Sequence, residues 1–61
     1  MFVKCYLVEI NSSLETMYQE LDEAGINYTV ESCGDGYMEI TFETFSIGEI
    51  QDINEIMKWY V

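Results

Sequence analysis

The stretch from residue 26 to residue 45, INYTVESCGDGYMEITFETF, constrains the fold of this chain most strongly. Apolar and polar residues alternate on both sides of the segment Gly34–Gly36, which is the period-2 pattern of a half-buried antiparallel hairpin. A three-residue turn at this segment pairs Val30 with Ile40 and keeps the apolar residues on one face. A two-residue Asp-Gly turn would place Ile40 opposite Glu31, so we expect the three-residue turn.

The predicted register sets two glutamates against each other. Glu31 lies directly opposite Glu39, and Asn27 lies opposite Glu43, all on the face of the hairpin that points to water. Like charges directly opposite each other on neighbouring strands destabilise a sheet. The fold by itself therefore gives no reason for this pair.

The composition describes a small and strongly acidic folded domain. Residues 1–61 are enough for one domain, and a hydrophobic content of 49% is too high for a disordered acidic tail. Twelve carboxylates stand against two lysines, Lys4 and Lys58, for a net charge of −10. This balance repels phosphate groups and anionic membranes, so we expect basic proteins as partners and no direct binding to nucleic acid or membrane. A single core of this size is marginal, so self-association is also expected.

The chain lacks the residues that most enzymatic and metal sites need. It has no histidine and no arginine, and its only cysteines, Cys5 and Cys33, lie on predicted strands, where we expect buried, reduced thiols. The segment Gly34–Gly36 has neither the strand-to-helix context nor the basic residue of a phosphate-binding loop, and the spacing of a calcium loop is missing. We therefore expect no enzymatic activity, no catalytic residue, no bound metal and no cofactor.

The first residues, MFVKCYLVEINSS, lack the longer apolar run and the small-residue cleavage site of a signal peptide. No stretch approaches the roughly 18 apolar residues that span a membrane. We expect the protein to act in the cytoplasm, or in the host cytoplasm if a phage encodes it.

Residues 2–10, FVKCYLVEI, predict a first strand, because β-branched and aromatic residues continue up to a polar Asn-Ser-Ser segment. Both sides of this strand are largely apolar, with Tyr6 and Val8 on one side and Val3 and Leu7 on the other. A strand of this kind needs cover on each side, and we expect a second copy of the chain to supply part of it.

The spacing of apolar residues predicts a first helix over residues 13–24. Ser12 and Glu15 have the spacing of a capping box, and Gly25 stands where a left-handed residue ends a helix. The acidic pair Asp22–Glu23 falls in the last turn, where the helix dipole disfavours negative charge. This pair is a second set of carboxylates that is kept against a local preference.

A second helix is predicted near the end of the sequence. Ser46 and Glu49 repeat the capping-box spacing, and Phe45 and Ile50 have the spacing of a hydrophobic staple. Trp59 points away from the apolar stripe of this helix by about half a turn. We therefore expect Trp59 to be available for contact with another molecule.

The predicted element order is β-α-β-β-α, an α+β two-layer sandwich. A right-handed crossing from the first strand to the second leaves a gap for the third, which gives an antiparallel sheet in the order 1-3-2 with both helices on one face. This topology resembles a ferredoxin-like unit that lacks its last strand, a similarity that implies nothing about function. The first strand is then an edge, and its apolar residues predict a homodimer in which two such edges pair into a six-stranded sheet.

The acidic surface carries the functional expectation. In size, acidity and absence of catalytic residues the chain resembles, as a class and not by a motif, the small acidic nucleic-acid mimics that phages make against host proteins, including restriction, CRISPR and transcription factors. The resemblance implies an inhibitor that engages a basic, nucleic-acid-binding protein as a decoy. The candidate binding residues are Glu31, Glu39 and Glu43 on the sheet, Glu15, Asp22 and Glu23 on the first helix, and the aromatic anchors Trp59, Tyr37 and Phe45.

Three other interpretations stay open. The first is that an acidic exterior only keeps a small protein soluble. The second is an antitoxin-like or structural interaction subunit, whose acidic face neutralises one basic protein without copying nucleic acid. The third is a dimeric module that binds a small ligand in a groove between the helices.

Overall fold

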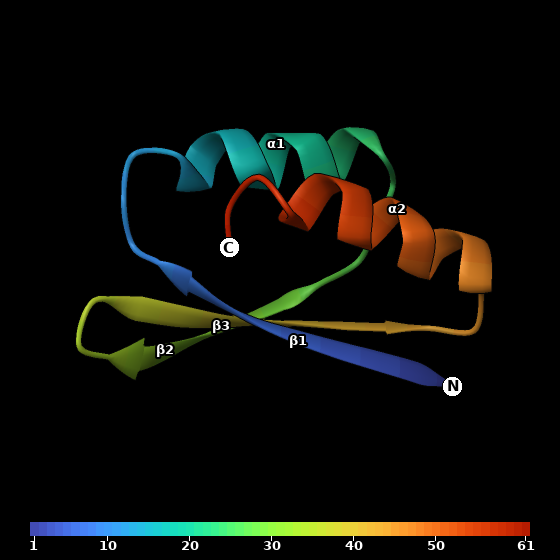
Figure 1. The fold of residues 1–61 in the computed structure, drawn as a ribbon, viewed down its shortest axis with the longest axis horizontal. Helices are drawn as coiled ribbons and strands as arrows, with labels where there is room; N and C mark the ends of the chain where they lie inside the picture. Colours follow the sequence, from blue (N-terminus) through green and yellow to red (C-terminus); the bar gives the residue numbers. More distant parts are fainter.

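The computed structural model describes residues 1–61 and contains one three-stranded antiparallel sheet and two helices. In chain order the elements are β1 (Phe2–Glu9), α1 (Leu14–Glu23), β2 (Thr29–Gly34), β3 (Tyr37–Thr44) and α2 (Ile47–Met57). The sheet order is β1-β3-β2, and both helices lie on the same side of it (Figure 1). The predicted α+β class and strand order are confirmed.

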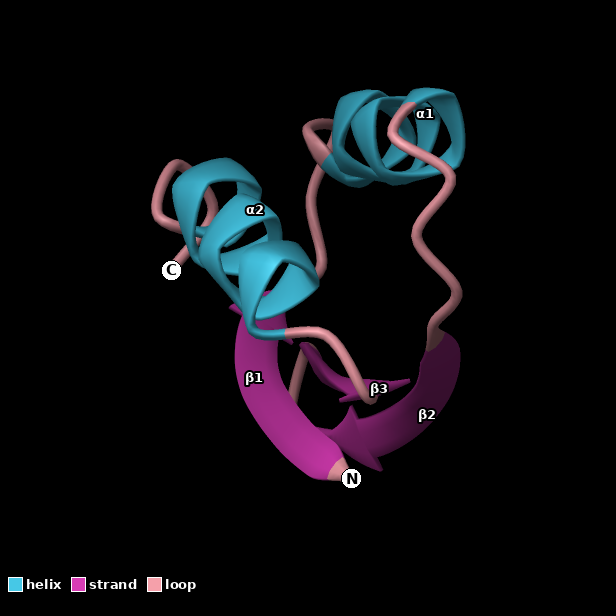
Figure 2. Cartoon of the chain, turned by 90° about the vertical axis from the view of Figure 1, so that its right-hand side faces the viewer, coloured by secondary structure: helices cyan, strands magenta, loops and turns pink.

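Each helix lies over one edge of the sheet. Figure 2 shows α2 above β1 and α1 above β2, with β3 between the two edge strands. The other side of the sheet carries no helix or loop in this view. Neither helix has both the length and the apolar character that crossing a membrane requires.

The core lies between the helices and the sheet. It is built by alternate residues of the strands and by residues three or four positions apart on the helices, as the two periodicities require. Its buried members are Val8, Leu14, Met17, Leu21, Ile26, Ile40, Phe42, Ile53 and Met57. Ile40 and Phe42, on the central strand, are completely buried.

The hairpin has the predicted register but not the predicted turn. The strands are joined by two residues, Asp35 and Gly36, with φ of 53° and 82°, the positive values that a tight hairpin turn needs. A β-bulge at Cys33 then takes up one residue of β2, so that Val30 still lies opposite Ile40. The expected three-residue turn is therefore wrong, because the bulge reconciles the favoured Asp-Gly turn with the apolar register.

The start of α1 differs from the predicted capping box. Ser13 is the capping residue, and its side chain makes no capping hydrogen bond. The side-chain oxygen of Asn11 accepts a hydrogen bond from the Ser13 amide at 2.8 Å, an Asx-turn that leads the chain into the helix at Leu14. The prediction based on Ser12 and Glu15 is wrong, because the asparagine one position earlier sets the turn.

The end of α1 is the predicted Schellman motif. Gly25 has a φ of 71°, and its amide donates to the carbonyl of Asp22 at 3.1 Å. The amide of Ile26 donates to the carbonyl of Leu21 at 3.0 Å, and both of these side chains are buried in the core. The left-handed glycine therefore directs the chain from the helix back into the core.

The start of α2 confirms half of its predicted capping box. The hydroxyl of Ser46 accepts a hydrogen bond from the Glu49 amide at 3.3 Å. The Ser46 amide donates to the hydroxyl of Thr44 at 3.1 Å, in place of the Glu49 carboxylate. Phe45 is 82% exposed, so the predicted staple with Ile50 does not form.

Two glycine substitutions test the helix ends against each other. Gly25→Ala should lower the free energy of unfolding by about 1–2 kcal/mol, because alanine is strained at a left-handed φ. Gly48→Ala, within α2, should raise it by about 0.5–1 kcal/mol, since an added Cβ there meets only the Ser46 hydroxyl at 3.6 Å. Urea unfolding measures both. A stabilising Gly25→Ala would contradict the Schellman ending.

Candidate functional site

The side of the sheet that faces away from the helices is not covered by another element of the fold, and we call it the outer sheet face (Figure 2). Because Val8, Ile40 and Phe42 are buried under the helices, the residues that alternate with them point to the other side. The outer sheet face consists of Val3, Cys5, Leu7 and Glu9 from β1, Tyr37, Glu39, Thr41 and Glu43 from β3, and Thr29 and Glu31 from β2.

Carboxylates dominate the part of the outer sheet face that lies over β2 and β3. Glu31 is the register partner of Glu39, as predicted, so their side chains start about 5 Å apart. Glu43 follows on the same side of β3. No lysine lies on this face, because Lys4 is the register partner of the buried Phe42 and points to the helix side. These negative charges have no compensating cation.

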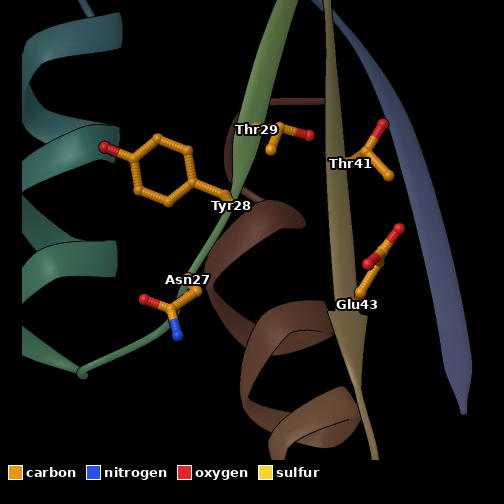
Figure 3. Close-up of a pocket in the computed structure, with 5 residues that line it drawn as sticks. All are labelled: Asn27, Tyr28, Thr29, Thr41 and Glu43. Atoms are coloured by element: carbon orange, nitrogen blue, oxygen red, sulfur yellow. The ribbon is translucent and has the colours of Figure 1, made fainter.

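A small hollow lies next to the carboxylates. It has a volume of about 190 Å³ and is lined by Asn27, Tyr28, Thr29, Thr41 and Glu43 (Figure 3). Thr29 and Thr41 are register partners, whereas Asn27 precedes the first residue of β2 and lines the same hollow as Glu43. The ring of Tyr28 points toward α1 (Figure 3). The hollow therefore adds hydroxyl and amide groups to the acidic face.

The two threonines were not among the predicted site residues. Their position follows directly from the register that pairs Val30 with Ile40. In this register Thr41, the residue after Ile40, lies opposite Thr29, the residue before Val30. The alternation of the sequence could therefore have identified them.

The predicted aromatic anchors do not form one cluster with the carboxylates. Tyr37, at the start of β3, is partly exposed on the outer sheet face opposite Glu9. Phe45 follows the other end of β3, so the two rings are separated by about 25 Å of extended strand. They are two separate apolar sites at opposite ends of the strand.

The three predicted carboxylates of α1 all lie on its solvent-exposed side. Glu15 and Asp22 are seven residues apart and share one side of the helix, and Asp22 is close enough to Tyr28 to raise the pKa of its hydroxyl, after burial as the main cause. Glu23 follows Asp22 directly, about 100° further around the helix, so the three carboxylates span less than a third of its circumference.

Glu23 also borders a second hollow, which we call the helix-side hollow. It has a volume of about 450 Å³ and is lined by Glu20, Glu23, Ala24, Glu55, Ile56 and Trp59. Trp59 is 76% exposed. The Nζ atom of Lys58 lies 5.4 Å from the centre of the indole ring and 2.8 Å from a carboxylate oxygen of Glu55. The predicted Trp59 anchor thus lies beside Glu23, far from the outer sheet face.

Glu20 and Glu55 are acidic residues of this hollow that the sequence prediction did not include. Glu20 accepts a hydrogen bond from the Tyr60 hydroxyl at 2.9 Å, which ties the segment after α2 to α1. The spacing of Glu20 and Glu23 on one helix could have indicated that they share a side. That α2 lies against this side depends on tertiary packing.

Comparisons with protein-family models, with curated proteins and with solved structures find no match to this chain. The candidate sites are the two acidic surfaces, the outer sheet face and the helix-side hollow.

The repulsion between Glu31 and Glu39 can be measured as stability. Glu39→Gln removes one charge of the opposed pair and should raise the free energy of unfolding by about 0.3 kcal/mol at low salt, a gain that about 1 M salt should abolish. Glu15→Gln is the matched control, because it changes the net charge equally but removes a carboxylate from the first turn of α1, where the helix dipole favours it. Equal effects of the two substitutions in urea unfolding would show that the opposed pair has no specific cost.

The Tyr60 hydroxyl should make the protein sensitive to alkali. Burial, and then the hydrogen bond to Glu20, raise the pKa of Tyr60 above its ordinary value of 10.0. A raised folded-state pKa stabilises the fold below the unfolded pKa, and this contribution is lost as the pH rises through the folded pKa. The free energy of unfolding should therefore fall above about pH 10, and less steeply in Tyr60→Phe.

Chemical unfolding at a series of alkaline pH values tests this. Tyr37→Phe removes a hydroxyl from an exposed tyrosine and should keep the wild-type slope. A Tyr60→Phe protein with an unchanged slope would contradict a contribution from this hydroxyl. A residual slope is expected, since burial also raises the pKa of Tyr6 and Tyr28.

Proposed function

We propose that this protein is an acidic inhibitor that binds a basic, nucleic-acid-binding protein through the outer sheet face, in the manner of a nucleic-acid mimic. The observation that carries the proposal is the direct opposition of Glu31 and Glu39 on an uncovered surface without a lysine. A cationic partner would turn this unfavourable pair into a favourable one on binding.

Charge alone favours a basic partner over any other class. The chain has 12 acidic residues against two lysines, and Lys58 is already paired with Glu55. A protein that holds nucleic acid through lysine and arginine presents the charges that such a surface attracts over a Debye length of about 8–10 Å. The carboxylates then occupy the groups that would otherwise contact phosphates.

The polar hollow beside Glu43 supports the same proposal. Thr29, Thr41 and Asn27 offer hydroxyl and amide groups next to carboxylate oxygens. Contacts of proteins with nucleic-acid backbones combine cationic side chains with serine, threonine, asparagine and glutamine. A surface that pairs carboxylates with hydroxyl and amide groups can meet both kinds of side chain.

The proposed place of action is the cytoplasm, where nucleic-acid-binding host proteins are found, and the proposed biological class is the phage-encoded inhibitor of a host or defence protein. Both proposals follow from the resemblance in size and acidity to that class of inhibitors.

A second candidate is an antitoxin-like interaction subunit that uses the helix-side hollow. The observation in its favour is the exposed Trp59 beside Glu20, Glu23 and Glu55, since a desolvated aromatic residue often contributes most of the binding energy at an interface. Such a subunit would neutralise a basic protein without competing for its nucleic-acid site.

Three charge-matched double variants separate these functions. The first variant, Glu31→Lys with Glu39→Lys, alters the outer sheet face. The second, Glu20→Lys with Glu23→Lys, alters the helix-side hollow. The third, Glu15→Lys with Asp22→Lys, alters the exposed side of α1. A lysate of the source organism is passed over each immobilised protein at low and moderate salt, and the retained proteins are identified and eluted with DNA or RNA. We expect the first variant alone to lose the retained protein, with affinity reduced about 10- to 100-fold.

The elution decides between the two candidates. Under the proposed function, nucleic acid competes the partner off, and moderate salt weakens binding steeply. Retention that survives in the sheet variant, disappears in the Glu20 and Glu23 variant and resists nucleic acid would assign the function to the helix-side hollow. Equal loss in all three variants would show that retention depends on net charge and not on one face.

A further inference from the structure

The outer edge of β1 is an unpaired strand edge. β1 pairs only with β3, so one side of its backbone has no neighbour. The Ile10 amide donates to the carbonyl of Gly36 at 2.7 Å in the same register. Since hydrogen-bonded and non-hydrogen-bonded pairs alternate along an antiparallel ladder, the even residues of β1 bond to β3. The backbone groups of Val3, Cys5, Leu7 and Glu9 therefore point to the free edge.

This edge lacks the features that keep other edges from pairing. β1 is eight residues long and contains no proline and no bulge. Its one lysine, Lys4, lies with Nζ 5.7 Å from the centre of the Tyr6 ring, on the helix side of the sheet. The opposite edge of the sheet, β2, is different, since it is shorter, carries Glu31 and is interrupted by the bulge at Cys33. Only the β1 edge is open to a further strand.

Charge selects what the β1 edge can meet. Two copies of a chain with net charge −10 repel each other over most of their surfaces. Residues 1–8 contain no carboxylate and one lysine, so β1 is where two copies approach with least repulsion.

Uncovered apolar side chains flank the edge on both sides of the sheet. On the outer sheet face Val3 is 53% exposed and Leu7 is 57% exposed. On the helix side, the Tyr6 hydroxyl donates a hydrogen bond to the Asn54 side chain, so the stripe of α2 that contains Asn54 lies toward β1. Ile47 belongs to this stripe, seven residues before Asn54, and is 64% exposed. A second copy would cover both apolar strips.

We propose that two copies of this chain pair antiparallel through their β1 edges, with Cys5 on the two-fold axis and directly opposite Cys5 of the second copy. If the helices of both copies lie on the same side of the shared sheet, opposed residues must both be even-numbered or both be odd-numbered, because side chains alternate between the two faces. One residue of β1 then lies opposite itself in the second copy, and the two-fold axis runs between these two residues. An axis at Lys4 would place the two Lys4 residues opposite each other, and an axis at Tyr6 would place Val3 of one copy opposite Glu9 of the other. The axis at Cys5 places Val3 of one copy opposite Leu7 of the other. It also places Lys4 opposite Tyr6, which is a favourable cation–π pair.

The proposed register makes a chemical prediction. The Cys5 backbone points to the free edge, so the two Cys5 residues form a hydrogen-bonded pair with Cα atoms about 5.5 Å apart. This separation falls within the range of about 4.4–6.8 Å that a disulfide spans. Cys5 and Cys33 are exposed, so the expectation of buried thiols is wrong, and an added oxidant can reach the Cys5 thiol. Two Cys5 thiols then give up two protons and two electrons to diamide, which is reduced to the hydrazine, and an S–S bond forms.

Cross-linking tests the register. With Cys33→Ser removing the second thiol, diamide should convert most of the protein to a covalent dimer. In the Cys5→Ser, Cys33→Ser background, V3C alone and L7C alone should stay monomeric under denaturing electrophoresis, and a mixture of the two should give a covalent dimer. Cross-linking by V3C alone, or none in the mixture, would overturn the axis at Cys5.

Sedimentation tests the interface without oxidation. Cys5→Ser should sediment as a dimer, whereas Cys5→Lys should sediment as a monomer, because it opposes two lysines on the axis. Position 5 is exposed and lies opposite Thr41 within one chain, so circular dichroism should show both variants folded. A monomeric Cys33→Ser protein, or a Cys5→Lys protein that stays dimeric, would overturn the proposal. The outer-face variants Glu31→Lys with Glu39→Lys should stay dimeric, which separates this result from the proposed function.

Discussion

The register of β3 between its two neighbours determines what each face of this small sheet contains. Side chains alternate strictly along a strand, so the register that buries Ile40 and Phe42 also places Glu39 and Glu43 in water. A shift by one residue would exchange these sets and leave carboxylates under the helices. The hydrophobic core and the acidic surface therefore have a single origin, and one cannot be moved without the other.

The same arrangement explains why this fold leaves so much apolar surface uncovered. Both helices lie on one side of the sheet, and only 10 of 61 residues are buried. A domain of this size buries little apolar surface, yet Val3, Leu7 and Ile47 remain exposed around the β1 edge. The acidic part of the molecule lies on the opposite edge and on the outer face of the central strand. Glu39 and Glu43 are the register partners of Leu7 and Val3, so the acidic and the apolar surfaces adjoin each other on the outer sheet face.

The elements that a local pattern specifies were predictable, and those that depend on competition between neighbours were not. The alternation around Val30 and Ile40 predicted the register, and Gly25 predicted the Schellman ending, because each has one physical solution. The cap at Ser12 failed because Asn11 offers an earlier acceptor, and the hairpin turn failed because a bulge is invisible in the alternation. The opposed glutamates of the outer sheet face followed from the register. The approach of Trp59 to Glu23 depends on where α2 packs, which no local pattern encodes.

The bulge at Cys33 means that the tip of the hairpin can lose one residue without a change in the rest of the sheet. Ser32 already lies opposite Met38, and Gly34 opposite Tyr37, so the residue between them has no partner on β3. If Cys33 were deleted, the pairs Ser32–Met38 and Gly34–Tyr37 would follow each other in a regular ladder. The pairing of Thr29 to Ser32 with β3 would not change. A deletion at Cys33 would therefore leave Glu31 opposite Glu39, because the pairs on either side of the bulge already follow one another on β3.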